Sequence, residues 1–150
     1  MEVPLFNDQE FYDLNLSLGR ELYLLLKREL VDQFQIRTRR QLLLNNLFEL
    51  FKKLEENGGA DVFTEIWIDG SFVTTKAEPN DVDIVILHKT GTHVSGELQN
   101  CRLWREKYCC DIRYIEWGDS KTKDWFKNFF RNDSKGIIRI NLEGDRDEPY

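Results

Sequence analysis

The residues best suited to chemistry in this chain lie in one string, WIDGSFVTTKAEPNDVDIVIL, at positions 67–87. An apolar run ends at Gly70 and Ser71, nine residues follow, and Asp81 and Asp83 then open a second apolar run. Backbone N–H groups at a Gly-Ser turn can bind phosphate oxygens. Two carboxylates on one face of a strand can bind the divalent cation that accompanies phosphate. The pattern therefore predicts nucleotide chemistry.

Asp81 and Asp83 are two residues apart, so on a strand their side chains leave the same face, roughly 7 Å apart at the backbone. Asp83 stands where the apolar run begins, and a lone buried carboxylate would cost several kcal/mol or take up a proton. A bound Mg²⁺ or Mn²⁺ ion removes this conflict because it favours the ionised carboxylates. The alternative is that Asp81 only shapes the turn after Pro79 and Asn80 while Asp83 faces solvent.

A third carboxylate, Asp111, opens the next predicted strand, CDIRYIE. If this strand pairs with the strand of Asp83 and their starts match, the three carboxylates gather and suit a site for two metal ions. The alternative is that Asp111 pairs with Arg113, which shares its strand face. Lys76, in the loop after the Gly-Ser turn, either neutralises phosphate as a point charge or is simply solvated.

Periodic patterns place these residues within a single domain that spans residues 1–150. Leucines at helical spacing predict an N-terminal pair of helices at about 17–57, the second starting at a Thr38-x-x-Gln41 capping box and stopping at Asn57-Gly58. Other predicted elements are strands at 62–68, 82–87, 110–116 and 137–142, a helix at 94–107 and an aromatic helix at 122–131. This sheet core, at about 62–142, predicts an α/β (α+β) fold, a mixed β-sheet flanked by helices.

Composition disfavours several classes of protein. A formal net charge of −6 argues against a protein that holds long nucleic acid mainly by neutralising its phosphates. Three cysteines without a C-x-x-C spacing, and only two histidines, predict neither a disulfide framework nor a zinc cluster. The acidic start lacks an apolar signal core, and no apolar stretch approaches the roughly 20 residues of a membrane span. We therefore expect a cytoplasmic protein with no membrane contact.

The combined pattern resembles the DNA polymerase beta-type nucleotidyltransferase superfamily. Its members carry a hydrophobic-Gly-Ser element, a gap, Asp-x-Asp or Asp-x-Glu within a strand, and a third carboxylate downstream. Here the matching residues are Gly70, Ser71, Asp81, Asp83 and Asp111, and the likeness covers mainly residues 66–116. Together with the strings PNDVD and KGII, the pattern is also similar to small, poorly characterised bacterial and phage nucleotidyltransferase-like proteins.

The resemblance implies a role for each of these residues. Asp81 and Asp83 would bind both metal ions, and Asp111 would bind the catalytic metal and help to deprotonate the acceptor hydroxyl. Gly70 and Ser71 would hold the β- and γ-phosphates of a nucleoside triphosphate, while the acceptor oxygen attacks the α-phosphate and releases pyrophosphate. Little chain follows the third carboxylate, so the N-terminal helices would either help to grip the substrates or form an interface between copies of the chain.

Two functions follow as hypotheses. The first is a Mg²⁺-dependent nucleotidyltransferase that places a nucleoside monophosphate on a protein, an RNA end or a small hydroxyl compound; the acidic net charge favours a protein or small acceptor over long nucleic acid. Related minimal proteins act as antitoxins that modify a partner toxin, which extends the expectation to toxin–antitoxin or phage-defence systems. The second is a catalytically inactive binding module of the same fold, with a partner surface built from aromatic residues at Trp125, Phe126, Phe129 and Phe130.

Overall fold

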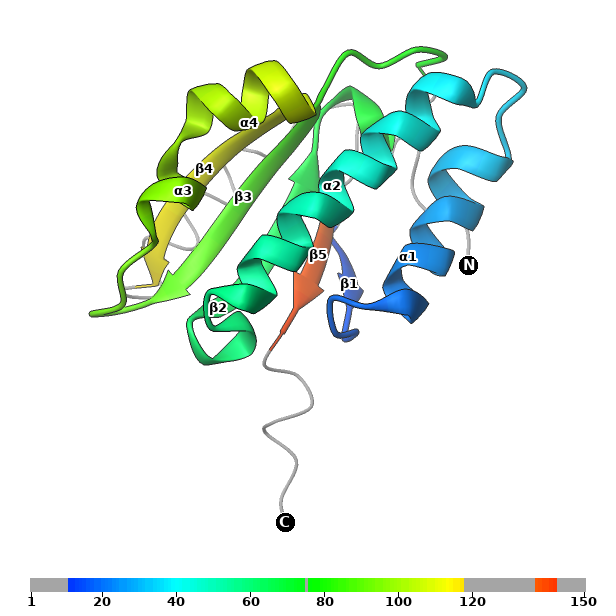
Figure 1. Cartoon of the computed structure of the whole chain (residues 1–150). Helices are drawn as coiled ribbons and strands as arrows, with labels where there is room; N and C mark the ends of the chain where they lie inside the picture. Colours follow the sequence, from blue (N-terminus) through cyan, green and yellow to red (C-terminus); the bar gives the residue numbers. More distant parts are fainter. Residues whose placement is uncertain (1–10, 75, 118–136, 143–150) are drawn as a thin grey trace.

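A computed structural model describes residues 11–74, 76–117 and 137–142 of the chain (Figure 1). Its strands form one five-stranded sheet in the order β1-β5-β2-β3-β4. The strands are β1 (Phe11–Leu14), β2 (Phe63–Asp69), β3 (Val82–Lys89), β4 (Cys110–Trp117) and β5 (Ile137–Asn141). β1 pairs with β5 and β3 with β4 in parallel, whereas β2 is antiparallel to both β3 and β5. The predicted mixed sheet with helices packed on it is confirmed.

The helices form a layer on one face of this sheet (Figure 1). They are α1 (Arg20–Lys27), continued by a π-helical turn (Arg28–Asp32), then α2 (Thr38–Glu56), α3 (Gly96–Gln99) and α4 (Cys101–Tyr108), with 3₁₀ turns at Gly59–Asp61 and Ser71–Val73. The layer forms because each long helix turns an apolar stripe inward; in α2 the buried stripe is Leu43, Leu44, Leu47, Leu50, Phe51 and Leu54. None of the described helices is both long and apolar enough to cross a bilayer.

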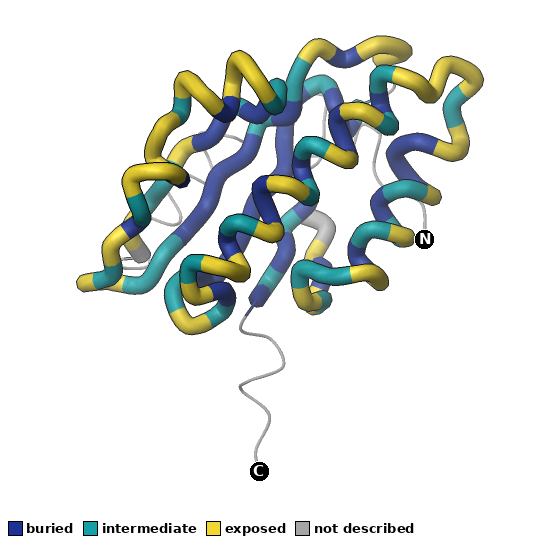
Figure 2. The backbone as a smooth tube through the Cα atoms, in the orientation of Figure 1, coloured by how far each residue is buried: buried dark blue, intermediate teal, exposed yellow. Residues whose placement is uncertain are grey.

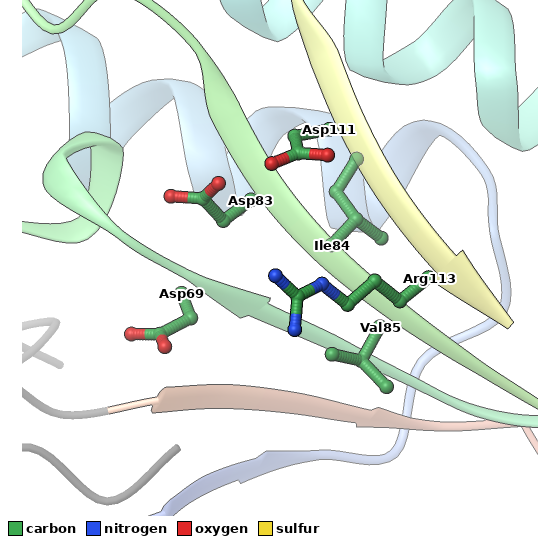
Figure 3. Close-up of a pocket in the computed structure, with 6 residues that line it drawn as sticks. All are labelled: Asp69, Asp83, Ile84, Val85, Asp111 and Arg113. Atoms are coloured by element: carbon green, nitrogen blue, oxygen red, sulfur yellow. The ribbon is translucent and has the colours of Figure 1, made fainter. Parts of the chain in front are cut away.

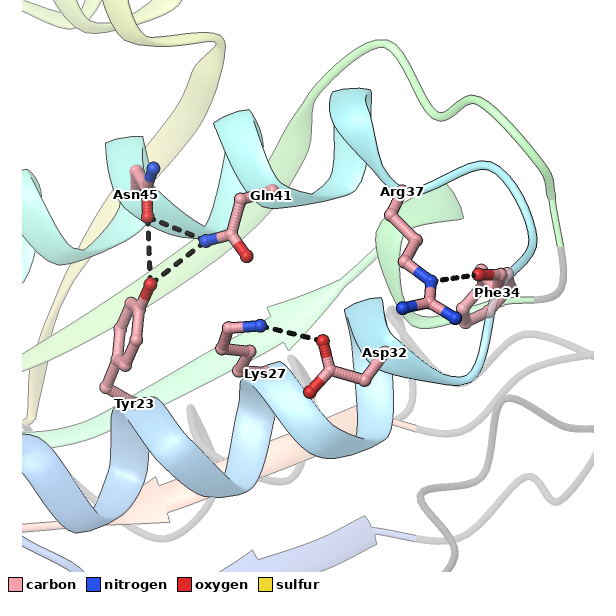
Figure 4. A network of polar contacts seen from close by, with 7 residues as sticks. All are labelled: Tyr23, Lys27, Asp32, Phe34, Arg37, Gln41 and Asn45. Atoms are coloured by element: carbon pink, nitrogen blue, oxygen red, sulfur yellow. Dashed lines mark hydrogen bonds and ion pairs between the residues drawn. The ribbon is translucent and has the colours of Figure 1, made fainter.

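α2 begins at Thr38 as predicted, but the predicted capping box does not form. Arg37 is the N-cap residue and its side chain makes no capping hydrogen bond, while Thr38 is already helical. Gln41 Nε2 instead donates to the Tyr23 hydroxyl and to Asn45 Oδ1, at 2.9 Å each (Figure 4). These contacts join α1 to α2 on the surface. Tertiary contact between the two helices has therefore replaced the local cap.

One further prediction about the elements changes, one strand is new, and one predicted helix is not tested. The single helix predicted at 94–107 is two helices, because Asn100 ends α3 and its Oδ1 then accepts the Leu103 N–H (3.2 Å) as the cap of α4. β1 was not predicted, since four residues carry little periodic signal and this strand depends on its pairing with the distant β5. The aromatic helix predicted at 122–131 lies outside the described residues.

The sheet separates two kinds of side chain onto its two faces. One face, here named the helix-covered face, carries isoleucines such as Ile66, Ile84 and Ile112, which pack against the leucines of α2 in the main core. The opposite face carries a small apolar cluster that includes Trp67 and Val85. Figure 2 shows that the burial runs along the central strands, with exposed positions concentrated on the outer sides of the helices.

Candidate functional site

Three aspartates lie in one row across β2, β3 and β4, at or next to the ends of these strands. Asp69 is the register partner of Asp83 in the antiparallel β2–β3 pair, and Asp83 is the register partner of Asp111 in the parallel β3–β4 pair. Paired residues on neighbouring strands direct their side chains to the same face, with strands about 4.8 Å apart. The expectation that the strand of Asp111 pairs with the strand of Asp83, with matching starts, is confirmed. We name this side of the sheet the carboxylate face.

The row lines a cavity of about 170 Å³. Its lining residues are Asp69, Asp83, Ile84, Val85, Asp111 and Arg113, drawn in Figure 3. Pockets that enclose a whole ligand usually measure about 300–1,000 Å³, whereas one water molecule takes about 30 Å³ of liquid. The cavity therefore has room for phosphate groups with a few waters.

Gly70 lies against the carboxylate of Asp83. An ideal Cβ at this position would stand 1.9 Å from Asp83 Oδ2, so no side chain fits there without displacing the aspartate. Gly70 also has φ +82° and ψ −166°, a backbone conformation that is essentially restricted to glycine. The glycine thus allows main chain and carboxylate to meet. Two separate parts of the sequence pattern, the Gly-Ser turn and the Asp-x-Asp segment, are in direct contact.

Ser71 and Lys76 lie further from the row. Ser71 is half-buried and begins the 3₁₀ turn, where its carbonyl accepts from Thr74 N–H (3.1 Å) and Oγ1 (2.7 Å). The Val73 N–H donates to the Gly70 carbonyl (3.2 Å), which completes the turn. Lys76 is exposed, and neither Ser71 nor Lys76 is among the residues that line the cavity. The structure therefore brings Gly70, but not Lys76, to the carboxylates.

Asp81 is placed differently from the other predicted carboxylates. It precedes β3 by one residue, is half-buried, and is not among the residues that line the cavity. Burial first, and then the charges of Cys109 and Asp81, raise the pKa of the Cys110 thiol to about 12. Asp81 is thus close enough to this buried thiol to affect its pKa. In the row, the member that sequence reasoning missed is Asp69.

Asp69 has only a weak signal in the sequence. It ends β2 immediately before Gly70 and is 8% exposed, so it is a buried carboxylate that directly follows the apolar residues Ile66, Trp67 and Ile68. Its position opposite Asp83 depends on the register between β2 and β3, which includes a bulge between Phe63 and Glu65. No local pattern gives that register. The position before the glycine is the only hint that the sequence offers.

Arg113 adds a positive charge to the site. It is two residues after Asp111 on β4, and in Figure 3 its guanidinium extends across β3 toward the side of Asp69 and Asp83. The alternative prediction paired Arg113 with Asp111 alone, but Arg113 also lines the cavity together with Asp69 and Asp83. A guanidinium beside three carboxylates lowers the net negative charge of the cavity and can also bind phosphate oxygens in a bidentate manner.

The donor set suits a hard divalent cation. Within the described residues, no group of three or more His, Cys, Asp or Glu side chains is arranged so that it could hold a metal ion by itself. Mg²⁺ rarely needs such a cage, because it is commonly held by one or two carboxylates together with substrate phosphates and waters. Asp83 and Asp111, adjacent in register on one face, provide that pair of carboxylates. The site therefore fits an ion that arrives with a phosphorylated ligand.

Comparison with known proteins yields one match. The model of a family described as a family of unknown function (DUF6932) matches residues 10–141, most of the chain. No curated protein and no solved structure shows a significant match.

Proposed function

The chain belongs to this family of unknown function, and we propose that it is a nucleotidyltransferase, which transfers a nucleoside monophosphate from a nucleoside triphosphate to a hydroxyl acceptor. One observation carries the proposal: the Gly70 backbone lies against Asp83, and Asp83 is in register with Asp111. Main-chain groups that can face phosphate thus lie beside a carboxylate that can hold a cation. Both are features that phosphoryl-type transfer requires.

In this proposal the carboxylates bind the metal ion, and one of them also accepts a proton. Asp83 and Asp111 hold Mg²⁺ or Mn²⁺, which when bound neutralises phosphate oxygens and makes the α-phosphorus more electrophilic. Asp111 takes the proton of the acceptor hydroxyl. The acceptor oxygen then forms a bond to the α-phosphorus, the bond from that phosphorus to the bridging oxygen breaks, and pyrophosphate leaves. Asp69 takes the place in the row that the sequence-based hypothesis assigned to Asp81.

The remaining residues bind the phosphates. Gly70 and Ser71 start the 3₁₀ turn, whose internal hydrogen bonds use the N–H groups of Val73 and Thr74. The earlier N–H groups of such a turn have no partner within it and are suited to phosphate oxygens. Arg113 contributes a cation to the same oxygens. Lys76, from its exposed position, would act at longer range.

The size and charge of the protein limit the substrates. In this proposal the cavity of about 170 Å³ takes the phosphates of the nucleotide. The net charge of −6 favours a protein or small hydroxyl acceptor over long nucleic acid. We also keep as proposals a cytoplasmic location, a role in toxin–antitoxin or phage-defence systems, and an interface between copies through α1 and α2, whose Leu24 and Leu42 are 49% and 45% exposed.

A transfer assay tests the activity. The protein is incubated with each of the four nucleoside triphosphates, labelled at the α-phosphate, with Mg²⁺ or Mn²⁺ and cell lysate. We expect label transfer that falls by at least about 100-fold in Asp83→Asn and Asp111→Asn, which remove a carboxylate from the row. Asp69→Asn should fall with them, whereas Asp81→Asn should stay within about threefold of wild type.

Asp32→Asn serves as the matched control for this assay. Asp32 lies on the surface, where its Oδ1 accepts from Lys27 Nζ at 2.7 Å (Figure 4), and its substitution changes the net charge by the same amount. Transfer that survives in Asp83→Asn would overturn the assignment of the row. Transfer lost in Asp81→Asn but kept in Asp69→Asn would restore the sequence-based choice of carboxylates.

The alternative is a catalytically inactive binding module, and Arg113 is the observation that favours it. A permanent cation in the cavity can hold phosphate without a metal ion. Calorimetric titration with the triphosphates, with and without Mg²⁺, separates the two. Binding without transfer to any acceptor, unchanged by removal of Mg²⁺ and lost in Arg113→Gln, would support the module. An absence of both binding and transfer would remove both functions.

A further inference from the structure

Arg40 is a buried cation that serves main-chain carbonyls. It lies in the first turn of α2, with its side chain 0% exposed. Its Nη1 donates to the carbonyls of Leu30 (3.0 Å) and Phe72 (2.7 Å), and its Nη2 to those of Thr74 (2.7 Å) and Lys76 (2.6 Å). Three of these four carbonyls belong to the segment that follows Gly70. We name its described residues, Gly70–Thr74 and Lys76, the Gly-Ser loop.

The groups around Arg40 stabilise its positive charge, although none of these four hydrogen bonds goes to a carboxylate. Its guanidinium carbon lies 3.7 Å from the centre of the Phe34 ring and 5.7 Å from that of Phe72. Burial lowers the pKa of Arg40 to about 10, so the side chain remains protonated at pH 7. Its charge is compensated by four charge-assisted hydrogen bonds and by the ring faces, which favour a cation. A neutral side chain would leave those carbonyls without their donor.

The direction of the carbonyls explains why this loop needs a cation. The carbonyls of Phe72, Thr74 and Lys76 all converge on one guanidinium, so their negative ends point toward the same small volume. Without a donor there, the carbonyls repel one another, and that of Phe72 remains buried without a hydrogen bond from Arg40, which is costly. The neighbouring Arg39 Nε donates to the Pro79 carbonyl (3.2 Å), further along the same connection. The start of α2 therefore holds the connection between β2 and β3 at two points.

We propose that Arg40 is a positioning residue that holds the Gly-Ser loop, and with it the Gly70 backbone against Asp83, in the conformation that receives nucleotide phosphates. This inference rests on the proposed function, because the phosphate site is the one proposed above. Arg40 itself is inside the protein and does not line the cavity. Its effect on a ligand is therefore exerted through the loop.

Hydrogen exchange tests the loop without any ligand. The N–H groups of Val73 and Thr74 donate within the turn to the carbonyls of Gly70 and Ser71, so their protection reports whether the turn is intact. In Arg40→Met we expect their exchange to become at least about tenfold faster relative to amides of β3, and in Arg40→Lys about threefold faster. Lysine keeps the charge but cannot reach four carbonyls with a planar fork.

Leu47→Ala is the matched control, because Leu47 is buried in the same helix about two turns beyond Arg40. It lowers the stability of the whole fold without removing a hydrogen bond to the loop, because leucine has no side-chain donor. We expect it to speed the exchange of the loop and of β3 in the same proportion. A loop that exchanges no faster than β3 in Arg40→Met would overturn the inference, as would selective loop exchange in Leu47→Ala.

Nucleotide binding supplies the second measurement, with Mg²⁺–ATP as the probe and Mn²⁺ alone as its comparison. We expect the Kd of Mg²⁺–ATP to rise about tenfold in Arg40→Met and about threefold in Arg40→Lys, while the Kd of Mn²⁺ alone stays within about twofold. Equal weakening of both ligands, or of ATP in Leu47→Ala, would contradict a role in positioning. If the wild-type protein binds no nucleotide, the proposed function fails. The part of this inference that concerns phosphate binding then fails as well. Loop exchange still decides separately whether Arg40 holds the turn.

Discussion

The two faces of the sheet differ in what they contribute, although the same three strands supply both. On the helix-covered face, β2, β3 and β4 present isoleucines to a broad layer of leucines from α1 and α2. On the carboxylate face, the same strands present three aspartates, Arg113 and a small apolar cluster. The first face provides most of the apolar burial that stabilises the fold. The second face gathers several ionisable side chains around a cavity, which is typical of a functional site.

Neighbouring residues along one strand therefore do opposite things. Ile68 belongs to the core, and Asp69 to the row; Cys110 is buried under α4, and Asp111 lines the cavity. Because side chains alternate between the faces, a shift of the register by one residue would exchange core and site completely. The large core on one face thus also fixes which residues reach the other.

The difference in packing between the two faces is tested most directly by the same Leu→Ala substitution on each face. Leu47 and Leu87 are 0% and 1% exposed, and they lie in the main core and in the small cluster of the carboxylate face, respectively. We expect Leu47→Ala to lower the free energy of unfolding by about 4 kcal/mol and Leu87→Ala by about 2 kcal/mol, since a small cluster collapses more readily around the deleted atoms. Urea denaturation measures both. Equal losses would show that the two faces are packed alike.

Two glycines sharpen the same comparison at the site. Gly70 and Gly91 have φ +82° and +81°, but a Cβ would meet Asp83 at the first and nothing within 4 Å at the second. We expect Gly91→Ala to cost about 1 kcal/mol of unfolding free energy from backbone strain alone, and Gly70→Ala about 3 kcal/mol with a loss of Mn²⁺ binding. Chemical denaturation and a Mn²⁺ titration measure the two effects. Intact Mn²⁺ binding in Gly70→Ala would argue against contact between the turn and the metal site.

The smallest effect concerns a titrating group on the helix-covered face. The pKa of Cys110 rises from 9.0 to about 12 through burial, so above pH 9 the folded state keeps a proton that the unfolded state has released. Stability from this group is complete below pH 9 and is lost between pH 9 and about 12, by about 1.4 kcal/mol per pH unit. Burial also raises the pKa of Tyr114, which acts in the same direction at higher pH.

Cys110→Ala should make the decline in stability between pH 9 and pH 10 smaller by roughly 1 kcal/mol. Denaturation curves at pH 8, 9 and 10 provide the measurement, and Cys101→Ala is the control with a half-buried thiol. An unchanged slope in Cys110→Ala would mean that this thiol ionises normally in the folded protein.

The local sequence pattern was sufficient to predict the mixed α+β fold and the proximity of Asp83 to Asp111. The apolar runs at 82–87 and 110–116 mark two strands whose starts align, and that alignment brings Asp83 beside Asp111. The hypothesis for Asp81 used the alternation of side chains along a strand. Asp81 lies one residue before β3 and is not among the residues that line the cavity, so its role in metal binding stays a prediction. Asp69 was missed because its position in the row depends on the register of β2, which is a tertiary property.

Arg40 illustrates a second limit of sequence reasoning. Next to Arg39 in a polar first turn, it looks like a solvated residue, and only its partners reveal its role. The nearest of the loop carbonyls that it binds, that of Phe72, is 32 residues away in the sequence. Likewise, the split of the predicted helix at 94–107 depends on one asparagine that both ends α3 and caps α4. The role of Arg40 depends on distant folded neighbours, whereas the break at Asn100 is a local capping effect that helical periodicity does not report.

The order of the strands also has a consequence during synthesis. β2 lies in the middle of the sheet, yet one of its two neighbours, β5, is the last strand of the described chain. At about 5–20 residues per second, a ribosome needs several seconds to produce the segment between them. During that interval one edge of β2 has no partner strand, and such edges invite pairing with other chains. The nascent protein therefore has a period of aggregation risk that ends only when β5 emerges and docks.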